Sequence, residues 1–149
     1  MGEIRSFMRG EHESCDSRFV AVESAVVEGE WDRARREWGE FVRLLSHHFC
    51  QEETVLFPAI EERLGFPFGP TQVMRSEHEQ MRRLLPVMEQ QLDVEHSQGY
   101  LGLAESMLML MQQHNMKEEE VLYPRADQEI DDSSMLIRQM QDCHQEPAS

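Results

Sequence analysis

Apolar residues recur every three or four positions through four long stretches of the chain, which is the spacing of helices that bury one face. No stretch alternates in steps of two, as a half-buried strand would. The pattern breaks at Gly29, at the Gly- and Pro-rich segment 65–70, at Gly99 and at 131–134. The spacing predicts an all-α fold, an antiparallel up-down four-helix bundle with apolar stripes over residues 4–26, 34–59, 74–92 and 103–121.

The bundle is expected to occupy residues 1–127 as one domain. Residues 128–149 are expected to form a C-terminal extension, with a short helix and then a disordered tail that ends in QEPAS. Pro58, Pro86 and Pro124 lie inside the helical stretches, where a proline usually kinks or ends a helix.

Every predicted helix carries a polar residue within its apolar stripe. The six are His12, His48, Glu52, His78, His114 and Glu118. A single buried histidine is usually a packing residue, but an unpaired ionised carboxylate in an apolar seam costs several kcal/mol. The two glutamates therefore indicate that cations share this part of the core.

An internal repeat relates the two halves of the chain. His12 and His78 are 66 residues apart, and so are His48 and His114. MRGEHE is matched by MRSEHE, and the segment VLFP that follows the first HxxxE motif is matched by VLYP after the second. The repeat predicts two helical hairpins around a pseudo-twofold axis, with all six polar side chains at about the same level near one end of the bundle.

The HxxxE spacing suits chelation, because residues four apart on a helix present their side chains on one face about 6 Å apart. Four imidazoles and two carboxylates make a symmetric binuclear site when each carboxylate bridges two metal ions. Each ion then has two nitrogen donors and one oxygen from each bridge. One or two positions of an octahedral ion stay open for water, an oxo bridge or a small ligand.

Composition limits the partners of such a domain. The 149 residues include 14 Lys and Arg against 29 Asp and Glu, and a formal charge of −15 repels nucleic acid and anionic lipid. No apolar run approaches the roughly 20 residues of a membrane-spanning helix, and no secretory signal is visible, so a cytoplasmic protein is expected. Cys15, Cys50 and Cys143 are expected to be free thiols, and a disulfide between the first two is not expected.

Several residues close to the motifs are open to two interpretations. Glu53, Glu119 and Glu120 are expected chiefly as a solvated face, with a role as metal donors or as partners of the histidines as the alternative. A group of aromatic residues is expected near the polar end, either shielding the site or capping the bundle. They are Phe49, Phe57, Phe66, Phe68 and Tyr123.

The ordered set His12, HxxxE at 48–52, His78 and HxxxE at 114–118 resembles the hemerythrin-like (HHE cation-binding) family, in its four-histidine variant. The resemblance covers residues 1–127, and it implies a four-helix bundle with a non-haem di-iron centre. It implies two iron ions with an oxo or hydroxo bridge, with Mn or Zn as substitutes. The four histidines would hold the metals, Glu52 and Glu118 would bridge them, and O2, NO or hydrogen peroxide would be the small-molecule partner.

One position departs from the oxygen-carrying members, which have a further histidine four residues before His78, where this chain has Met74. A thioether is a poor ligand for oxidised iron, so reversible O2 carriage is not expected. The four-histidine members suggest peroxide or nitric oxide chemistry instead, carried by the metals without a separate catalytic residue. The alternatives are a non-enzymatic module that stores, senses or delivers iron, and a metal-free acidic bundle that binds a partner.

Overall fold

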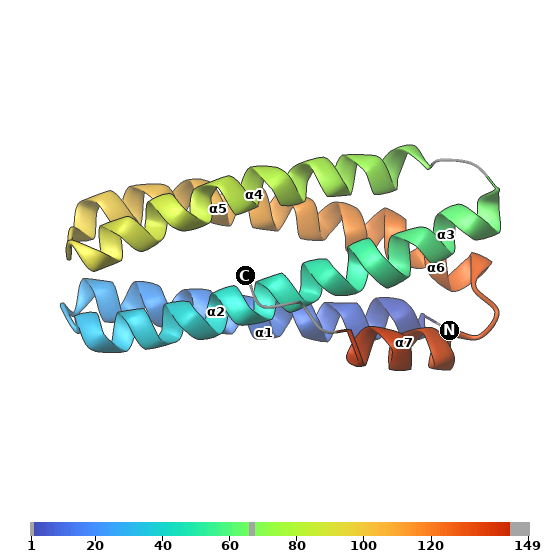
Figure 1. Ribbon diagram of the computed structural model, residues 1–149, viewed down its shortest axis with the longest axis horizontal. Helices are drawn as coiled ribbons and strands as arrows, with labels where there is room; N and C mark the ends of the chain where they lie inside the picture. The colour runs from blue at the N-terminus through green and yellow to red at the C-terminus, as the bar shows by residue number, and fades with distance from the viewer. Residues whose placement is uncertain (1, 66–67, 144–149) are drawn as a thin grey trace.

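The computed structural model describes residues 2–65 and 68–143, and within them it has helices and no strand, as the apolar spacing predicted (Figure 1). Four long rods run side by side. The elements are α1 Glu3–Val27, α2 Trp31–Gln51, η1 Glu52–Leu56, α3 Phe57–Leu64, α4 Gly69–Asp93, α5 Ser97–Lys117, η2 Glu118–Leu122, α6 Tyr123–Glu129 and α7 Ser133–Gln141.

The four rods are α1, then α2 continued by η1 and α3, then α4, and last α5 continued by η2 and α6. They form two antiparallel hairpins, α1 with α2 and α4 with α5, and both tight turns lie at the same end of the bundle (Figure 1). Gly29 makes the first turn at φ 72°, a conformation that glycine adopts without a Cβ clash. The second turn was expected at Gly99, but it centres on Glu95, which has φ 55°. Arg35 stabilises this turn by donating to the Leu92 carbonyl at 3.2 Å and pairing with the Glu95 carboxylate at 3.4 Å. Gly99 lies inside α5 instead.

Two of the prolines follow a turn of π-helix rather than ending a rod. The backbone N–H of Phe57 donates to the carbonyl of Glu52, and the N–H of Tyr123 donates to that of Glu118, five residues back in each case. The next residues, Pro58 and Pro124, have no N–H, and the helix resumes at its N-terminal turn, where proline is tolerated. Each proline thus follows a π turn that begins at one of the two glutamates.

The core consists of two apolar clusters with the polar residues between them. One cluster fills the half that contains the turns and includes Phe19, Phe41 and Met81. The other fills the opposite half and includes Leu56 and Met74. The polar positions lie along each rod between these clusters, so they are surrounded by apolar side chains at both ends.

Helix α7 folds back against α1 and η1 (Figure 1). It buries Leu136 and Met140, and the Gln51 side chain donates to the Met140 carbonyl at 3.1 Å. The end of this segment carries Cys143, which forms a disulfide with Cys50. The expectation of three free thiols is therefore wrong for this pair, because the fold-back of α7 brings together two cysteines that lie 93 residues apart.

The remaining cysteine, Cys15, is a buried free thiol as expected. The expected disordered tail, QEPAS at 145–149, and Phe66 lie outside the described residues. Asp127 of α6 accepts hydrogen bonds from the backbone N–H groups of Ile4 at 2.9 Å and Arg5 at 3.2 Å, and so caps the start of α1.

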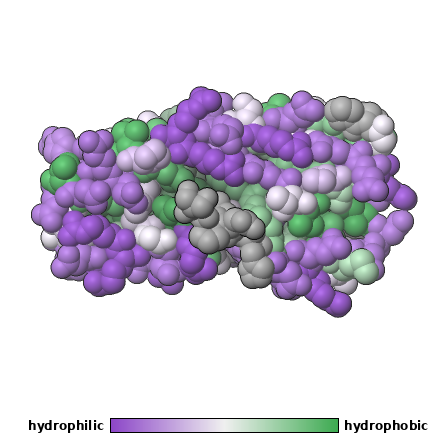
Figure 2. Space-filling model, viewed as in Figure 1, coloured by the Kyte–Doolittle hydropathy of each residue, from purple (hydrophilic) through white to green (hydrophobic). Residues whose placement is uncertain are grey.

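The face of the molecule seen in Figure 2 is mostly hydrophilic, in keeping with the excess of acidic residues. Among the described residues, no helix combines the length and the apolarity needed to cross a membrane.

Candidate metal centre

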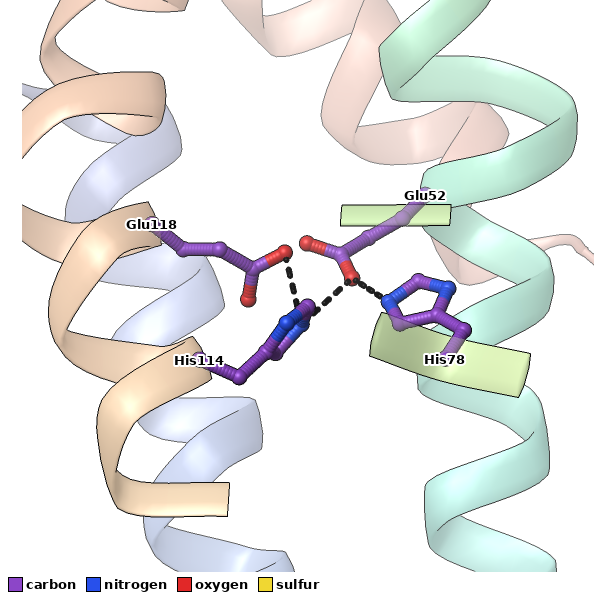
Figure 3. Close-up of side chains that lie close together, drawn as sticks. All are labelled: Glu52, His78, His114 and Glu118. Atoms are coloured by element: carbon purple, nitrogen blue, oxygen red, sulfur yellow. Dashed lines mark hydrogen bonds and ion pairs between the residues drawn. The ribbon is translucent and has the colours of Figure 1, made fainter. Parts of the chain in front are cut away.

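The structure brings all six predicted polar residues together in the core, each at most 3% exposed. His12 comes from α1, His48 from α2, Glu52 from η1, His78 from α4, His114 from α5 and Glu118 from η2. Figure 3 shows four of them, with the Glu52 and Glu118 side chains reaching inward from opposite rods toward His78 and His114. The repeat therefore predicted both the membership and the common level of this cluster.

The histidines form two pairs. The Nε2 atoms of His12 and His48 lie 3.1 Å apart, and their rings have centroids 4.7 Å apart. The ring centroids of His78 and His114 lie 4.8 Å apart. The first pair comes from α1 and α2, and the second pair comes from α4 and α5. Each hairpin therefore contributes one pair of imidazoles.

Each glutamate reaches both pairs. Glu52 Oε1 lies 3.0 Å from His78 Nε2 and 3.4 Å from His48 Nε2. Glu118 places Oε1 at 3.0 Å from His12 Nε2 and Oε2 at 3.2 Å from His114 Nε2. This is the placement that two bridging carboxylates need between two metal ions.

Outer carboxylates fix the orientation of three of the four rings. The Nδ1–H of His12 donates to Glu119 at 2.7 Å, and that of His78 donates to Glu53 at 2.7 Å. A neutral imidazole carries one hydrogen, so each of these rings turns an Nε2 lone pair toward the centre. Hydrogen bonds of this kind orient histidine ligands and raise their basicity in metal sites.

These contacts correct the expectation of a solvated face. Glu53 and Glu119 are only partly exposed and hold the histidines, whereas Glu120 is exposed as expected. Arg82 supports Glu53 with two hydrogen bonds, at 2.8 and 2.9 Å. Burial raises the pKa of Glu53, but the hydrogen bonds from His78 and Arg82 outweigh it and lower the pKa to about 2.

The sequence reasoning missed Glu77, the first residue of the second EHE motif. Its carboxylate accepts from His114 Nδ1 at 2.8 Å and pairs with Lys117. The repeat offered a signal, because the glutamate precedes the ligand histidine in both motifs. The equivalent contact does not form in the first half, where His48 Nδ1 has no hydrogen-bond partner among the described residues.

The sequence reasoning also missed the role of Tyr123. Its hydroxyl is buried, 2.6 Å from Glu52 Oε2, 2.8 Å from Glu118 Oε1 and 3.1 Å from His12 Nε2. Burial first, and then the negative charge of the two glutamates, raises the pKa of Tyr123 well above its usual 10, so the hydroxyl keeps its proton. The exchange of LFP for LYP between the repeats marked this position as different.

Aromatic rings line the other pair of histidines. The Phe49 ring stacks on His78 with centroids 3.9 Å apart, and Phe57, the repeat equivalent of Tyr123, lies 5.8 Å from the same imidazole. Both phenyl rings are buried. The site therefore has a hydroxyl beside His12 and apolar rings beside His78.

The donor set fits metal ions. With Nδ1 hydrogens directed outward, the Nε2 lone pairs point at one another and at carboxylate oxygens, and such a group of acceptors requires positive charge at its centre. His114 Nε2 and Glu118 Oε2 are buried with no hydrogen-bond partner among the described residues. Both are groups that a metal ion accepts as ligands.

Protons are the alternative source of that charge. Burial lowers the pKa of His12, but hydrogen bonds to Glu118 and Glu119 and the charges of Glu118 and Glu52 outweigh it and raise the pKa to about 9. Burial also lowers the pKa of His78 and of His114, but their glutamate partners outweigh it, so both pKa values are raised. A raised pKa favours the protonated imidazole, so protons and metal ions would compete for these three histidines.

Comparison with known proteins agrees with this chemistry. The family model described as "Hemerythrin HHE cation binding domain" matches residues 3–146. The iron-sulfur cluster repair proteins YtfE of Escherichia coli and Escherichia fergusonii are each 35% identical over 92 residues, which is 55% of this chain and 41% of the relative. The chain thus spans about two fifths of the length of these curated relatives. No solved structure gives a significant match. Because the family model covers nearly all of the sequence and the His and Glu cluster lies where the motifs predicted, this chain belongs to the hemerythrin HHE cation-binding domain family.

Proposed function

We propose that this chain holds two iron ions and reacts at them with O2, NO or hydrogen peroxide. The ligands would be His12 and His48 for one ion, His78 and His114 for the other, and Glu52 and Glu118 as bridges. The observation that carries this proposal is the reach of each buried glutamate to both histidine pairs.

Iron is supported by the nitrogen and oxygen donors, which suit it, and by the family match. When bound, two iron ions supply open coordination positions and one-electron redox chemistry. The chain supplies orientation, through the carboxylates on the Nδ1 atoms, and it keeps water away with Phe49 and Phe57. Tyr123 keeps its proton between the two glutamates, and its hydroxyl is placed to donate a hydrogen bond to either carboxylate.

Metal content tests the ligand set. The untagged chain should bind two irons after anaerobic loading with Fe(II), measured by mass spectrometry. Glu52→Gln and Glu118→Gln should each bind less, while Glu120→Gln, which changes an exposed glutamate beside the motif, should bind two. Two irons retained in both bridging variants would rule out the bridging role, and no iron in the unchanged chain would rule out the proposal.

Reactivity is tested on the same loaded protein. Its visible spectrum should change on addition of O2, NO or hydrogen peroxide, and the reagent should be consumed. An unchanged spectrum with all three reagents would leave the metal site in place but exclude the proposed reaction.

A second candidate is an iron-handling module, and the name of the YtfE relatives, iron-sulfur cluster repair proteins, favours it. Such a module should release iron readily. Rapid transfer of Fe(II) to a chelator, without consumption of peroxide or NO, would support iron handling over the proposed reaction. Slow release together with consumption would support the reaction.

A further inference from the structure

An apolar pocket of about 380 Å³ lies beside the metal centre, between the start of α4 and the η2 turn. Val73 and Met74 line one side, and Val121 and Leu122 line the other. The Lys117 side chain lies at the edge of the pocket, where its ammonium group pairs with Glu77. The surface inside the pocket is therefore almost entirely apolar.

The inner wall of this pocket adjoins the ligands. Met74 precedes His78 by four residues and Leu122 follows Glu118 by four, so each lies about one helical turn from a ligand. Both side chains are buried, with Met74 3% and Leu122 1% exposed, whereas Val73 and Val121 at the outer rim are 48% and 57% exposed. The pocket thus opens to solvent and ends at two flexible or branched side chains in front of the metal centre.

The internal repeat shows that this opening is specific to one half of the site. The equivalent positions 66 residues earlier are Phe7, Met8, Val55 and Leu56. Met8 and Leu56 belong to the apolar cluster that includes Leu136 and Met140 of α7, and Phe7 and Val55 pack against that cluster. Helix α7 packs directly on α1 and η1. Helix α7 therefore closes in the first half the groove that stays open in the second.

The open side leads to the half of the site without a phenol. Tyr123 lies against His12, whereas His78 has Phe57 and Phe49 as its aromatic neighbours. The pocket thus lies on the side of the site where the aromatic neighbours of the imidazole are phenyl rings.

We propose that this pocket is the access and binding site for a small uncharged gas such as O2 or NO, with Met74 as its gate, and that the gas reaches the ion held by His78 and His114. The inference rests on the proposed function, and it narrows the choice among the three small molecules. An apolar lining favours a gas over hydrogen peroxide, because peroxide would lose hydrogen bonds to water and find none in the pocket.

Xenon tests the pocket without any iron, because xenon binds apolar cavities. In the metal-free chain, xenon should shift the methyl NMR signals of Met74, Val121 and Leu122. Val121→Trp should abolish these shifts by filling the pocket, while Val87→Trp, at a valine of α4 that is 43% exposed, should leave them unchanged. Val73→Phe gives a second blocked variant if Val121→Trp loses its helical circular dichroism.

Nitric oxide then tests access on the iron-loaded chain. Val121→Trp should slow NO association by about tenfold or more relative to Val87→Trp, with equal iron content and an equal rate with peroxide. Equal NO rates in the two variants would overturn the access role. Peroxide slowed as strongly as NO would overturn the preference for a gas.

The outcomes separate the two proposals. If the chain takes up no iron but binds xenon, and Val121→Trp blocks the xenon, the pocket proposal stands and the di-iron function is refuted. Absence of xenon shifts would overturn the pocket whether or not iron binds. If light scattering then shows a dimer with these methyl groups at its interface, the pocket is a contact between two copies of the chain.

Discussion

Tyr123→Phe removes one buried hydroxyl and little else. The phenyl ring keeps the volume of the side chain nearly constant. The other half of the chain already has a buried phenylalanine, Phe57, at the equivalent position. In the metal-free chain the substitution deprives two buried carboxylates, Glu52 and Glu118, of a donor that lies 2.6 and 2.8 Å from them. One hydrogen serves both oxygens, so one hydrogen bond to a charged group is lost, which is worth about 1.5–3 kcal/mol.

The loss should depend on metal. A bound cation neutralises the carboxylates, so the hydroxyl should contribute only about 0.5–1.5 kcal/mol, as an ordinary hydrogen bond does. The assay is urea unfolding followed by circular dichroism at the helical band, with EDTA and again with bound Zn(II), which has no redox chemistry. The difference in unfolding free energy between Tyr123→Phe and the unchanged chain should be larger with EDTA.

Tyr100→Phe is the matched control, because Tyr100 is also fully buried but its hydroxyl has no hydrogen-bond partner among the described residues. Removing that hydroxyl should change stability by less than about 0.5 kcal/mol, or increase it slightly. The reasoning is refuted if Tyr123→Phe loses no more stability than Tyr100→Phe in EDTA. It is equally refuted if the loss at Tyr123 is the same with and without Zn(II).

Four further measurements follow from the structure. Reducing the Cys50–Cys143 disulfide, which closes 93 residues of chain, should lower the unfolding free energy by about 2–4 kcal/mol in urea titrations, and an unchanged midpoint would contradict the cross-link. Glu53→Gln should weaken metal binding by about 10- to 100-fold in competition with a chelator, and an unchanged affinity would show that the hydrogen bond to the ligand imidazole is unimportant. Hydrogen bonds from Arg75 lower the pKa of Glu61 below 4.5, so the contribution of Glu61 to folding stability is complete above pH 4.5 and is lost as the pH falls through the lowered pKa. The difference in unfolding free energy between the unchanged chain and Glu61→Gln should therefore shrink in acid titrations. Asp127→Ala should lose about 1 kcal/mol through its capping of α1, measured by thermal unfolding.

The sequence was sufficient for the bundle and for the six buried polar residues because both depend on regular spacing. The four-residue steps of HxxxE fix two side chains on one helix face, and the offset of 66 repeats that geometry in the second hairpin. Glu52 and Glu118 were informative because ionised groups rarely occupy an apolar stripe without a cation. No long-range contact had to be known to place them together.

The remaining features depend on contacts between segments that no local pattern relates. The pairing of Cys50 with Cys143 requires α7 to fold back on η1, and the sequence of α7 does not specify which groove it fills. The turn at Glu95 depends on Arg35 from another helix, so the glycine three residues into α5 was misleading. Tyr123 was visible as an exchange between repeats, but only the packing of α6 against α1 and α3 shows what its hydroxyl contacts.

Joining the two hairpins in one chain gives the site a freedom that a symmetric assembly lacks. If identical hairpins from two chains formed the same bundle, every substitution would appear twice, and the two metal positions would stay chemically equal. Here one gene encodes both halves, so a phenol stands beside one histidine pair and a phenyl ring beside the other, and a terminal helix covers one groove alone. Covalent linkage thus lets two equivalent histidine pairs acquire different surroundings without any change in the histidines themselves.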